Sequence, residues 1–357
     1  MNSRSILDDK IKEQVAQVAN HDFVREILDA NLNKYYPDFQ KIEELTLKAY
    51  KKHIGKTSAV FVIGYKIKYL NTDNKIGKLE LFATAHSDDS RKAAFEKLNF
   101  LYQNGFNQGK FQVTRPLFFL SEQKGFFYES SVGRSLFSFF KEDSFVDLGN
   151  ALDLAAGWVR ELHSLKDKST FSWPKFSVSN MIPSPQQFLP DFIEHDQLLG
   201  SKIKRIVSQI QNWEKELKKT FQETLIYGDY HPENIIITDL QAQNLKMIDF
   251  TDVALGDPMT DLGTFLQQFD FMGHRFFSRE KINQDKEYFF NSYFQKSLSE
   301  VEENYFQRIN LYQAWTALRT AVFLFYMHRD DSVKELLREV ESYILLIDNK
   351  EKRINIH

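Results

Sequence analysis

The sequence predicts an α+β fold with a small, β-rich N-terminal lobe and a large, mainly helical C-terminal lobe. Three observations support this prediction. Apolar, β-rich segments separated by turn residues gather in the first third of the chain. Amphipathic stretches with helical spacing dominate after Gly133. Two short apolar runs within residues 225–239 form an island of strand-like sequence in the helical half. We therefore expect an N-terminal lobe over residues 1–130 and a C-terminal lobe over 131–357.

In the N-terminal lobe we expect helices over residues 5–52, then an antiparallel sheet with one inserted helix. "SAVFVIGYKIKYL" (58–70) and "LELFATA" (79–85) predict a hairpin, because "NTDNKIGK" between them has a turn composition. "SDDSRKAAFEKLNFLYQNG" (87–105) predicts the helix, since it opens on capping residues and closes on Asn-Gly. "FQVTRPLFFL" (111–120) and "GFFYESS" (125–131) predict further strands.

The C-terminal lobe begins with "SFVDLGNALDLAAGWVRELHSLK" (144–166), which predicts a long amphipathic helix. Residues 186–221 are expected to be mostly helical, and residues 280–348 strongly so. His163, near the end of the first of these helices, is expected to pack or cap.

The composition limits the classes of function. Hydrophobic residues make up 42% and charged residues 27% of the 357 residues, as in soluble globular proteins. A net charge of -3 favours neither a nucleic-acid nor a membrane partner. Because the chain has no cysteine, disulfides, zinc thiolates and thiol nucleophiles are excluded. The charged N-terminus and the lack of a long apolar run indicate a cytoplasmic protein, and leave the oligomeric state open.

The segment "HIGKTSAV" (53–60) contains the Gly-Lys-Thr tail of a phosphate-binding P-loop. A P-loop needs a glycine where this chain has Tyr50, and a helix where a strand is predicted. Two interpretations remain. The segment is a glycine turn between two strands, or it is a turn whose backbone also covers the phosphates of a nucleotide, and the rest of the chain favours the latter.

The strongest functional signal is "LIYGDYHPENIIITD" (225–239). Asp229 and Asn234 have the D-x-x-x-x-N spacing of a phosphotransfer loop, in which the aspartate accepts the hydroxyl proton and the asparagine ligates a metal. "LKMIDFTDV" (245–253) then ends a strand at Asp249, where a magnesium-binding aspartate would follow such a loop. Carboxylate and amide oxygens suit magnesium.

Together with "GDPMTDLG" (256–263), the motifs "GDYHPEN" and "MIDFTD" resemble the aminoglycoside phosphotransferase family. This family belongs to a protein-kinase-like superfamily that includes choline, ethanolamine, homoserine and maltose kinases. The resemblance covers roughly residues 50–330. It implies a protein-kinase-like two-lobed fold, Asp229 as the catalytic base, and Mg²⁺ held by Asn234 and Asp249. It also implies ATP or GTP as phosphate donor and a small-molecule acceptor.

The resemblance implies further roles. Glu96 matches the helix glutamate that pairs with a nucleotide-binding lysine. Asp257 and Asp261 match the family's helix-start carboxylates, although aspartates near a helix N-terminus are favourable for structural reasons alone. The hinge, whose backbone would bind adenine, is Tyr128, Glu129, Ser130 and Ser131. The residues that would shape the catalytic loop are Gly228, His231 and Pro232.

The chain departs from the family at two positions. Tyr227 stands where histidine is frequent, and a tyrosine can still pack the loop. The phosphate-gripping lysine of the third strand falls at or near Thr84, which carries no charge. Lys66 and Lys68 share one face of the preceding strand, because side chains alternate with period two. One of them is expected to reach the phosphates, as in the with-no-lysine protein kinases, unless both are solvated strand residues.

Two functions follow. The first is ATP- and magnesium-dependent transfer of phosphate to a hydroxyl of a small molecule, such as a sugar, amino alcohol, aminoglycoside-like compound or other metabolite. The alternative is a degenerate member that binds a nucleotide or ligand without transfer. The complete set of Asp229, Asn234 and Asp249 favours the first, and Thr84 favours the second.

The acceptor is not specified by a motif. Residues 262–357 are almost neutral, whereas a polycationic acceptor usually needs a cluster of carboxylates. The acidic pairs at 302–303 and 330–331 are also explained as solvated helix faces. Four aromatic residues are expected to be core rather than a cation cage: Tyr305, Tyr312, Trp315 and Tyr326.

Overall fold

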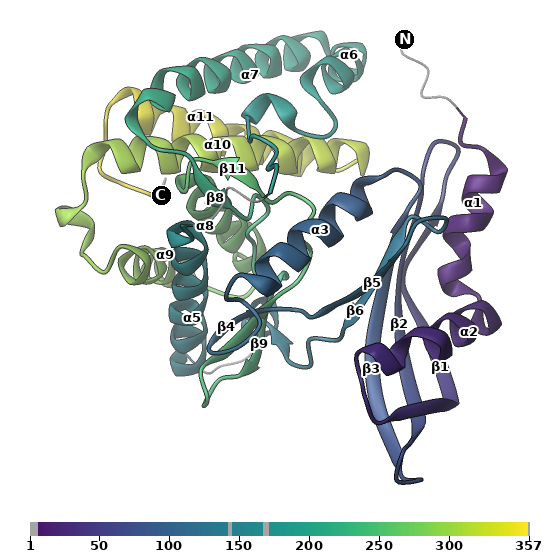
Figure 1. Ribbon diagram of the computed structural model, residues 1–357. Coiled ribbons are helices and arrows are strands. Elements are labelled where there is room, and N and C mark those ends of the chain that lie inside the picture. Colours follow the sequence, from purple (N-terminus) through teal and green to yellow (C-terminus); the bar gives the residue numbers. More distant parts are fainter. Residues whose placement is uncertain (1–5, 142–144, 167–170, 356–357) are drawn as a thin grey trace. The chain divides into compact units, whose positions relative to one another are not determined.

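The computed structural model describes residues 6–141, 145–166 and 171–355 (Figure 1). The chain forms two compact units. The first comprises the residues up to Val132 together with Lys246–Thr251, and the second comprises Gly133–Leu245 and the residues from Asp252 onward. The α+β class is confirmed. The short segment 246–251 groups with the first unit, whereas the boundary drawn from the sequence assigns it to the C-terminal lobe.

The first unit is built on a five-stranded antiparallel sheet with the order β1-β2-β3-β6-β5. The predicted hairpin and the inserted helix are confirmed. The strands are β1 (Phe39–Ile54), β2 (Ala59–Asn71), β3 (Ile76–His86), β4 (Phe111–Val113), β5 (Pro116–Leu120) and β6 (Gly125–Glu129), and the helices are α1 (Asp9–Ala16), α2 (His21–Asn31) and α3 (Ser90–Gln103).

The expected helix over residues 5–52 is wrong from residue 39 onward, where the chain forms β1. Two irregularities in the pairing of β1 with β2 explain the error. The register shifts between Phe39 and Lys41 and again between Ile42 and Glu44. Each shift breaks the alternation of a strand, so the buried residues Phe39, Ile42 and Leu45 recur every three positions, as in a helix.

The two faces of the sheet have different partners within the first unit. One set of alternate residues on β2, including Phe61, Ile63 and Tyr65, forms a core with α1 and α2. Thr84 lies on the other face, opposite Phe126 of β6. Phe95 of α3 contacts the Phe126 ring, with 5.5 Å between the centroids. The face that carries Thr84 is therefore the face that α3 covers.

The turn between β1 and β2 is the Gly-Lys-Thr segment. The N–H of Gly55 donates to the carbonyl of Ser58 at 2.8 Å, which closes the turn. The glycine turn between two strands is thus confirmed, and the coverage of nucleotide phosphates by this turn stays a prediction.

The second unit is mainly helical, as predicted. α10 packs against α8 and α11, and α5 packs against α9 (Figure 1). Its helices are α4 (Leu136–Phe139), α5 (Phe145–Ser164), α6 (Pro185–His195), α7 (Gln197–Leu217), α8 (Met259–Gly273), α9 (Arg279–Phe294), α10 (Glu303–Tyr326) and α11 (Asp330–Asp348). Its strands are β7 (Arg134–Ser135), β8 (Thr224–Ile226), β9 (Ile235–Asp239) and β11 (Ala254–Gly256), and β10 (Asn244–Met247) runs into the first unit.

In the mainly helical second unit, the strands on either side of the predicted catalytic loop each form a short antiparallel pair. β8 pairs with β11, and β7 pairs with β9. The loop between β8 and β9 is residues 227–234. Within the described ranges, no helix combines the length and the apolar composition that crossing a membrane requires.

Candidate functional site

The loop after β8 is held by a buried carboxylate of α8. Asp261 accepts hydrogen bonds from the backbone N–H groups of Tyr227 and Gly228, both at 2.7 Å. Gly228 has φ +87°, and a Cβ there would lie 2.5 Å from the carbonyl oxygen of Asp252. Only glycine fits this position without displacing the chain. The glycine turn and the carboxylate together set the direction in which Asp229 projects.

Asp261 is itself fixed by neighbouring helices. His163 of α5 places Nε2 at 2.9 Å from Oδ2 of Asp261, and its Nδ1 at 2.8 Å from the hydroxyl of Tyr293 in α9. The carboxylate of Asp261 is fully buried. His163 therefore serves as a buried partner of Asp261, which agrees with the packing role expected from the sequence.

Asp257, the other carboxylate at the start of α8, also makes contacts that stabilise the fold. Oδ1 of Asp257 accepts from the N–H of Met259 at 3.0 Å and from Nη1 of Arg308 at 2.7 Å. Burial raises the pKa of Asp257 to about 6, and the Arg308 guanidinium opposes that shift. Because both partners are buried, this pair fixes the start of α8 against α10.

Two buried tyrosines flank Asp229 in the sequence and anchor the loop from behind. The hydroxyl of Tyr230 donates to the carbonyl of Ala155 at 2.7 Å, and its ring stacks on Trp158. Tyr227 is fully buried and meets Trp158 edge-on. Tyr227 thus packs the loop at the position where the family often has histidine.

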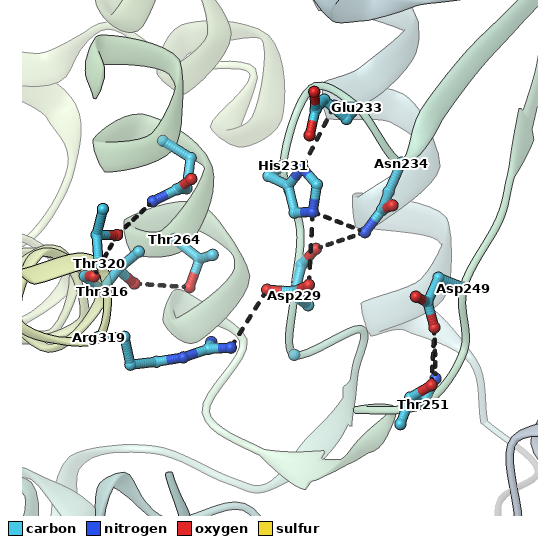
Figure 2. A network of polar contacts seen from close by, with 12 residues as sticks. Asp229, His231, Glu233, Asn234, Asp249, Thr251, Thr264, Thr316, Arg319 and Thr320 are labelled. Carbon is cyan, nitrogen blue, oxygen red and sulfur yellow. Dashed lines mark hydrogen bonds and ion pairs between the residues drawn. The ribbon is translucent and has the colours of Figure 1, made fainter. Parts of the chain in front are cut away.

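Asp229 is partly open and lies between two basic side chains (Figure 2). Its Oδ2 is 3.4 Å from Nε2 of His231, and its Oδ1 is 3.5 Å from Nη2 of Arg319. Burial raises the pKa of Asp229, but the hydrogen bond from His231 and the charges of Arg319 and His231 outweigh it. The pKa of Asp229 is therefore lowered, and the side chain is an ionised acceptor at neutral pH.

Asn234 lies in the same network. Its Nδ2 donates to the carbonyl of Asp229 at 3.2 Å and lies 3.0 Å from Nε2 of His231 (Figure 2). With the amide nitrogen turned into the loop, the amide oxygen is the atom that could ligate a cation. Pro232 accepts from the N–H of Phe137 at 3.1 Å, which ties the loop to α4. The structure thus brings Asp229, His231 and Asn234 together.

Arg319 is a site residue that sequence reasoning missed. It lies on α10, and its guanidinium sits 4.7 Å from the centre of the Trp315 ring one turn earlier. The W-x-x-x-R spacing was visible in the sequence, but nothing in it pointed to Asp229, which lies far away along the chain.

Asp249 belongs to the first unit. It adopts φ +62°, a left-handed conformation that aspartate tolerates better than most residues. Its Oδ1 accepts from the N–H and Oγ1 of Thr251, at 3.3 and 2.8 Å (Figure 2). The side chain is exposed, so Oδ2 remains accessible as a metal ligand.

Asn234 in the second unit and Asp249 in the first each carry an oxygen of a kind that Mg²⁺ accepts. No group of three or more His, Asp or Glu side chains suited to a metal ion occurs among the described residues. Mg²⁺ normally takes one or two protein oxygens and completes its shell with phosphates and water. Each residue, considered within its own unit, therefore remains a candidate for such a ligand.

The expected hinge is partly occupied by contacts inside the first unit. The N–H of Glu129 donates to the carbonyl of Arg115 at 2.9 Å, and the N–H of Ser130 to the carbonyl of Glu80 at 2.9 Å. The side chain of Glu129 accepts from Tyr36 at 2.7 Å. Any backbone contact to adenine would therefore use the groups from the Ser130 carbonyl onward.

The two lysines expected to bind the phosphates, Lys66 and Lys68, lie away from Thr84 along the sheet. Lys66 and Lys68 do share the face of Thr84, but they are exposed and pair with Glu80 and Glu44 at 3.6 and 2.6 Å. Lys66 is opposite Glu80, four residues along β3 from Thr84, which is about 13 Å. This placement gives neither lysine a contact near Thr84.

The glutamate that the resemblance places on the buried side of α3 lies on its exposed side. Glu96 is exposed, whereas the next residue, Lys97, is buried and donates to the carbonyl of Thr251 at 2.6 Å. One residue along a helix turns the side chain by about 100°. α3 therefore presents a lysine, not the expected glutamate, to its buried side.

The sequence profile of the phosphotransferase enzyme family matches residues 68–294. A choline kinase from Cryptosporidium parvum has a TM-score of 0.62 at 14% identity, covering 92% of this chain and 97% of that chain. An amicoumacin kinase in complex with AMP-PNP and Ca²⁺ has a TM-score of 0.60 at 12% identity, covering 92% and 95%.

An ethanolamine kinase of Plasmodium vivax has a TM-score of 0.55 at 15% identity, covering 86% of this chain and 84% of that chain. At such identities these likenesses show the protein-kinase-like fold, which confirms the fold predicted from the motifs. No curated protein matches the sequence significantly.

Substitution of Asp261 by asparagine is expected to destabilise the protein. The amide presents a donor to one of two backbone N–H groups, so at least one charge-assisted hydrogen bond is lost. We expect the free energy of unfolding to fall by about 1.5–3 kcal/mol. Urea denaturation measures it, with Asp153→Asn, an exposed aspartate of α5, as control. Equal stability of Asp261→Asn and the control would contradict the anchoring role.

Proposed function

Because the chain belongs to the phosphotransferase enzyme family, a family of small-molecule kinases, we propose that it transfers the terminal phosphoryl group of ATP or GTP to a hydroxyl of a small molecule. The observation that carries this proposal is the loop in which Asp229 is ionised, partly open, and bonded through its own carbonyl to Asn234. The same proposal assigns the protein to the cytoplasm, with a nucleotide and a small acceptor as its partners and no nucleic acid.

Asp229 would orient the acceptor hydroxyl and take its proton. The lowered pKa keeps the carboxylate ionised, and a hydroxyl attacking a loose phosphoryl transition state needs an aligned acceptor more than a strong base. His231 and Arg319 hold the two carboxylate oxygens, so the orientation is set before the acceptor arrives. Bound Mg²⁺, held by Asn234 and Asp249, would offset the negative charge of the phosphates.

The alternative, a family member that binds a nucleotide without transfer, rests on one specific observation. Thr84 cannot supply the positive charge that a strand lysine gives to the phosphates, and neither Lys66 nor Lys68 lies beside it. Phosphoryl transfer is favoured if another cation of the first unit supplies that charge.

Guanidinium groups on the aromatic faces of α10, one of them beside Asp229, limit the acceptor. Trp315 is buried and carries the Arg319 guanidinium on its face, and Tyr305 carries that of Arg308, each at 4.7 Å. Tyr312 is buried as well. An acceptor with a quaternary ammonium group would need such a face and would meet a guanidinium instead. We therefore propose a neutral or negatively charged hydroxyl compound.

Replacement of Asp229 by asparagine should leave nucleotide binding intact and remove most of the transfer. A positioned general base contributes about 10²–10⁴-fold. Steady-state turnover against a panel of hydroxyl compounds measures the loss. Glu233→Gln, which changes an exposed carboxylate of the same loop, is the matched control and should keep wild-type turnover. If Asp229→Asn retains more than about a tenth of wild-type kcat, Asp229 is not the base.

Replacement of Asp249 by asparagine should weaken nucleotide binding only when magnesium is present. The amide keeps an oxygen but loses the charge that attracts the cation. Calorimetry of ATP binding with Mg²⁺ and with EDTA separates the affinity for the nucleotide itself from the gain in affinity that magnesium provides. A variant with the same gain from magnesium as the wild type would rule out this residue as the ligand.

The charge of the acceptor is tested with compounds of matched size: glycerate, glycerol and choline. We expect kcat/KM to fall in that order. Arg319→Gln should lower kcat/KM for glycerate about tenfold more than kcat/KM for glycerol, because only glycerate loses a charge-assisted hydrogen bond between its carboxylate and Arg319. Arg329→Gln removes an exposed arginine beyond the end of α10 and should change nothing. Preference of the wild type for choline over glycerate would refute the assignment.

A further inference from the structure

Two basic side chains of α3 reach the segment that carries Asp249. Nη1 of Arg91 donates to Oγ1 of Thr251 at 2.7 Å, and this hydroxyl in turn donates to Oδ1 of Asp249 at 2.8 Å. Nζ of Lys97 donates to the carbonyl of Thr251 at 2.6 Å. All four residues belong to the first unit, so these contacts are internal to it.

Arg91 and Lys97 use their charges differently. Lys97 is buried, and its ammonium is directed to the Thr251 carbonyl, which fits a positioning role. Arg91 is only half-buried, and the partner at its Nη1 is a neutral hydroxyl. Within the described part of the chain no carboxylate lies within ion-pair distance of Arg91, although the nearby Asp88 feels its charge.

One donor of Arg91 has no partner. Its Nε is buried, and no acceptor among the described residues bonds to it. An unsatisfied buried donor costs about 1–3 kcal/mol, and a ligand oxygen would recover that cost. The N–H groups of a guanidinium form a planar fork that matches two oxygens of a phosphate. Arg91 thus combines a half-exposed guanidinium with an Nε that no described residue satisfies, which suits an anionic ligand.

The charge of Arg91 acts on residues that the sequence assigns to nucleotide and magnesium binding. Burial raises the pKa of the Tyr128 phenol, Asp249 raises it further, and Arg91 acts against both. Tyr128 of the expected hinge thus feels the charges of Asp249 and Arg91 together. Asp88 and His86 at the end of β3 also lie within reach of the charge of Arg91.

Thr84 lies on the sheet face that α3 covers, as Phe95 and Phe126 show. A triphosphate brings about four negative charges, of which magnesium offsets only part. We propose that Arg91 binds the phosphates of the nucleotide, in place of the lysine that is absent at Thr84. This inference rests on the proposed use of a nucleotide triphosphate, and it moves the phosphate-binding cation from a strand to a helix.

The test is equilibrium binding of magnesium-ATP and of adenosine, measured by calorimetry without any acceptor. Arg91→Gln should raise the Kd of ATP about tenfold or more and leave that of adenosine unchanged, since adenosine has no phosphate. Arg91→Lys should restore part of the affinity. Lys92→Gln, an exposed neighbour on α3, is the matched control and should bind ATP like the wild type. Thermal unfolding of each variant checks the fold.

Several outcomes would overturn the inference. The inference fails if Arg91→Gln binds ATP as tightly as the wild type does. It also fails if Arg91→Gln loses adenosine binding in parallel with ATP binding, because a parallel loss would indicate a purely structural role. Loss of ATP binding in Lys66→Ala or Lys68→Ala, with no loss in Arg91→Gln, would return the cation to β2. If the wild type binds ATP through Arg91 but phosphorylates no acceptor, the inference holds and the proposed transfer fails.

Discussion

The buried carboxylate of Asp261 is the contact on which the loop of the second unit depends. It takes the N–H groups of Tyr227 and Gly228, which β8 leaves unpaired as the chain turns, and it is held in place by His163. A charged acceptor with several donors in a dry environment forms strong hydrogen bonds. Loop, α5 and α8 are thereby joined at one point, and the direction of Asp229 follows from it.

Burial separates the carboxylates that hold the structure from those available for chemistry. Asp257 and Asp261 are fully enclosed. Backbone donors take both oxygens of Asp261, and Met259 and Arg308 share one oxygen of Asp257. Asp229 keeps 35% of its side chain exposed, and its partners are at 3.4 Å or more. Asp249 is exposed and uses only one oxygen. Contacts of this kind leave room for a ligand, whereas displacing a partner of Asp261 would expose a buried charge.

Sequence patterns predicted the parts of the site that depend on local spacing. The glycine turn, Asp229, Asn234 and Asp249 lie on segments whose strand and turn signals are short-range. The role of Glu96 came from the resemblance to the family and stays a prediction; in the structure Glu96 is exposed and the next residue, Lys97, is buried. β1 was missed because its bulges imitate a helical period. The sequence alone did not decide whether Asp257 and Asp261 have a structural role, because that role depends on partners far away in the chain.

Arg91, Lys97 and Arg319 could not be found from the sequence, since each is defined by a contact to a residue far away in the chain. Their location has a physical consequence. A lysine on the third strand would be held by the hydrogen bonds of the sheet on both sides. Arg91 instead stands on α3, and it reaches Asp249 through one threonine hydroxyl. Because Arg91 and Lys97 already join α3 to the Asp249 segment, a phosphate bound by Arg91 would lie at a fixed position relative to the proposed magnesium ligand.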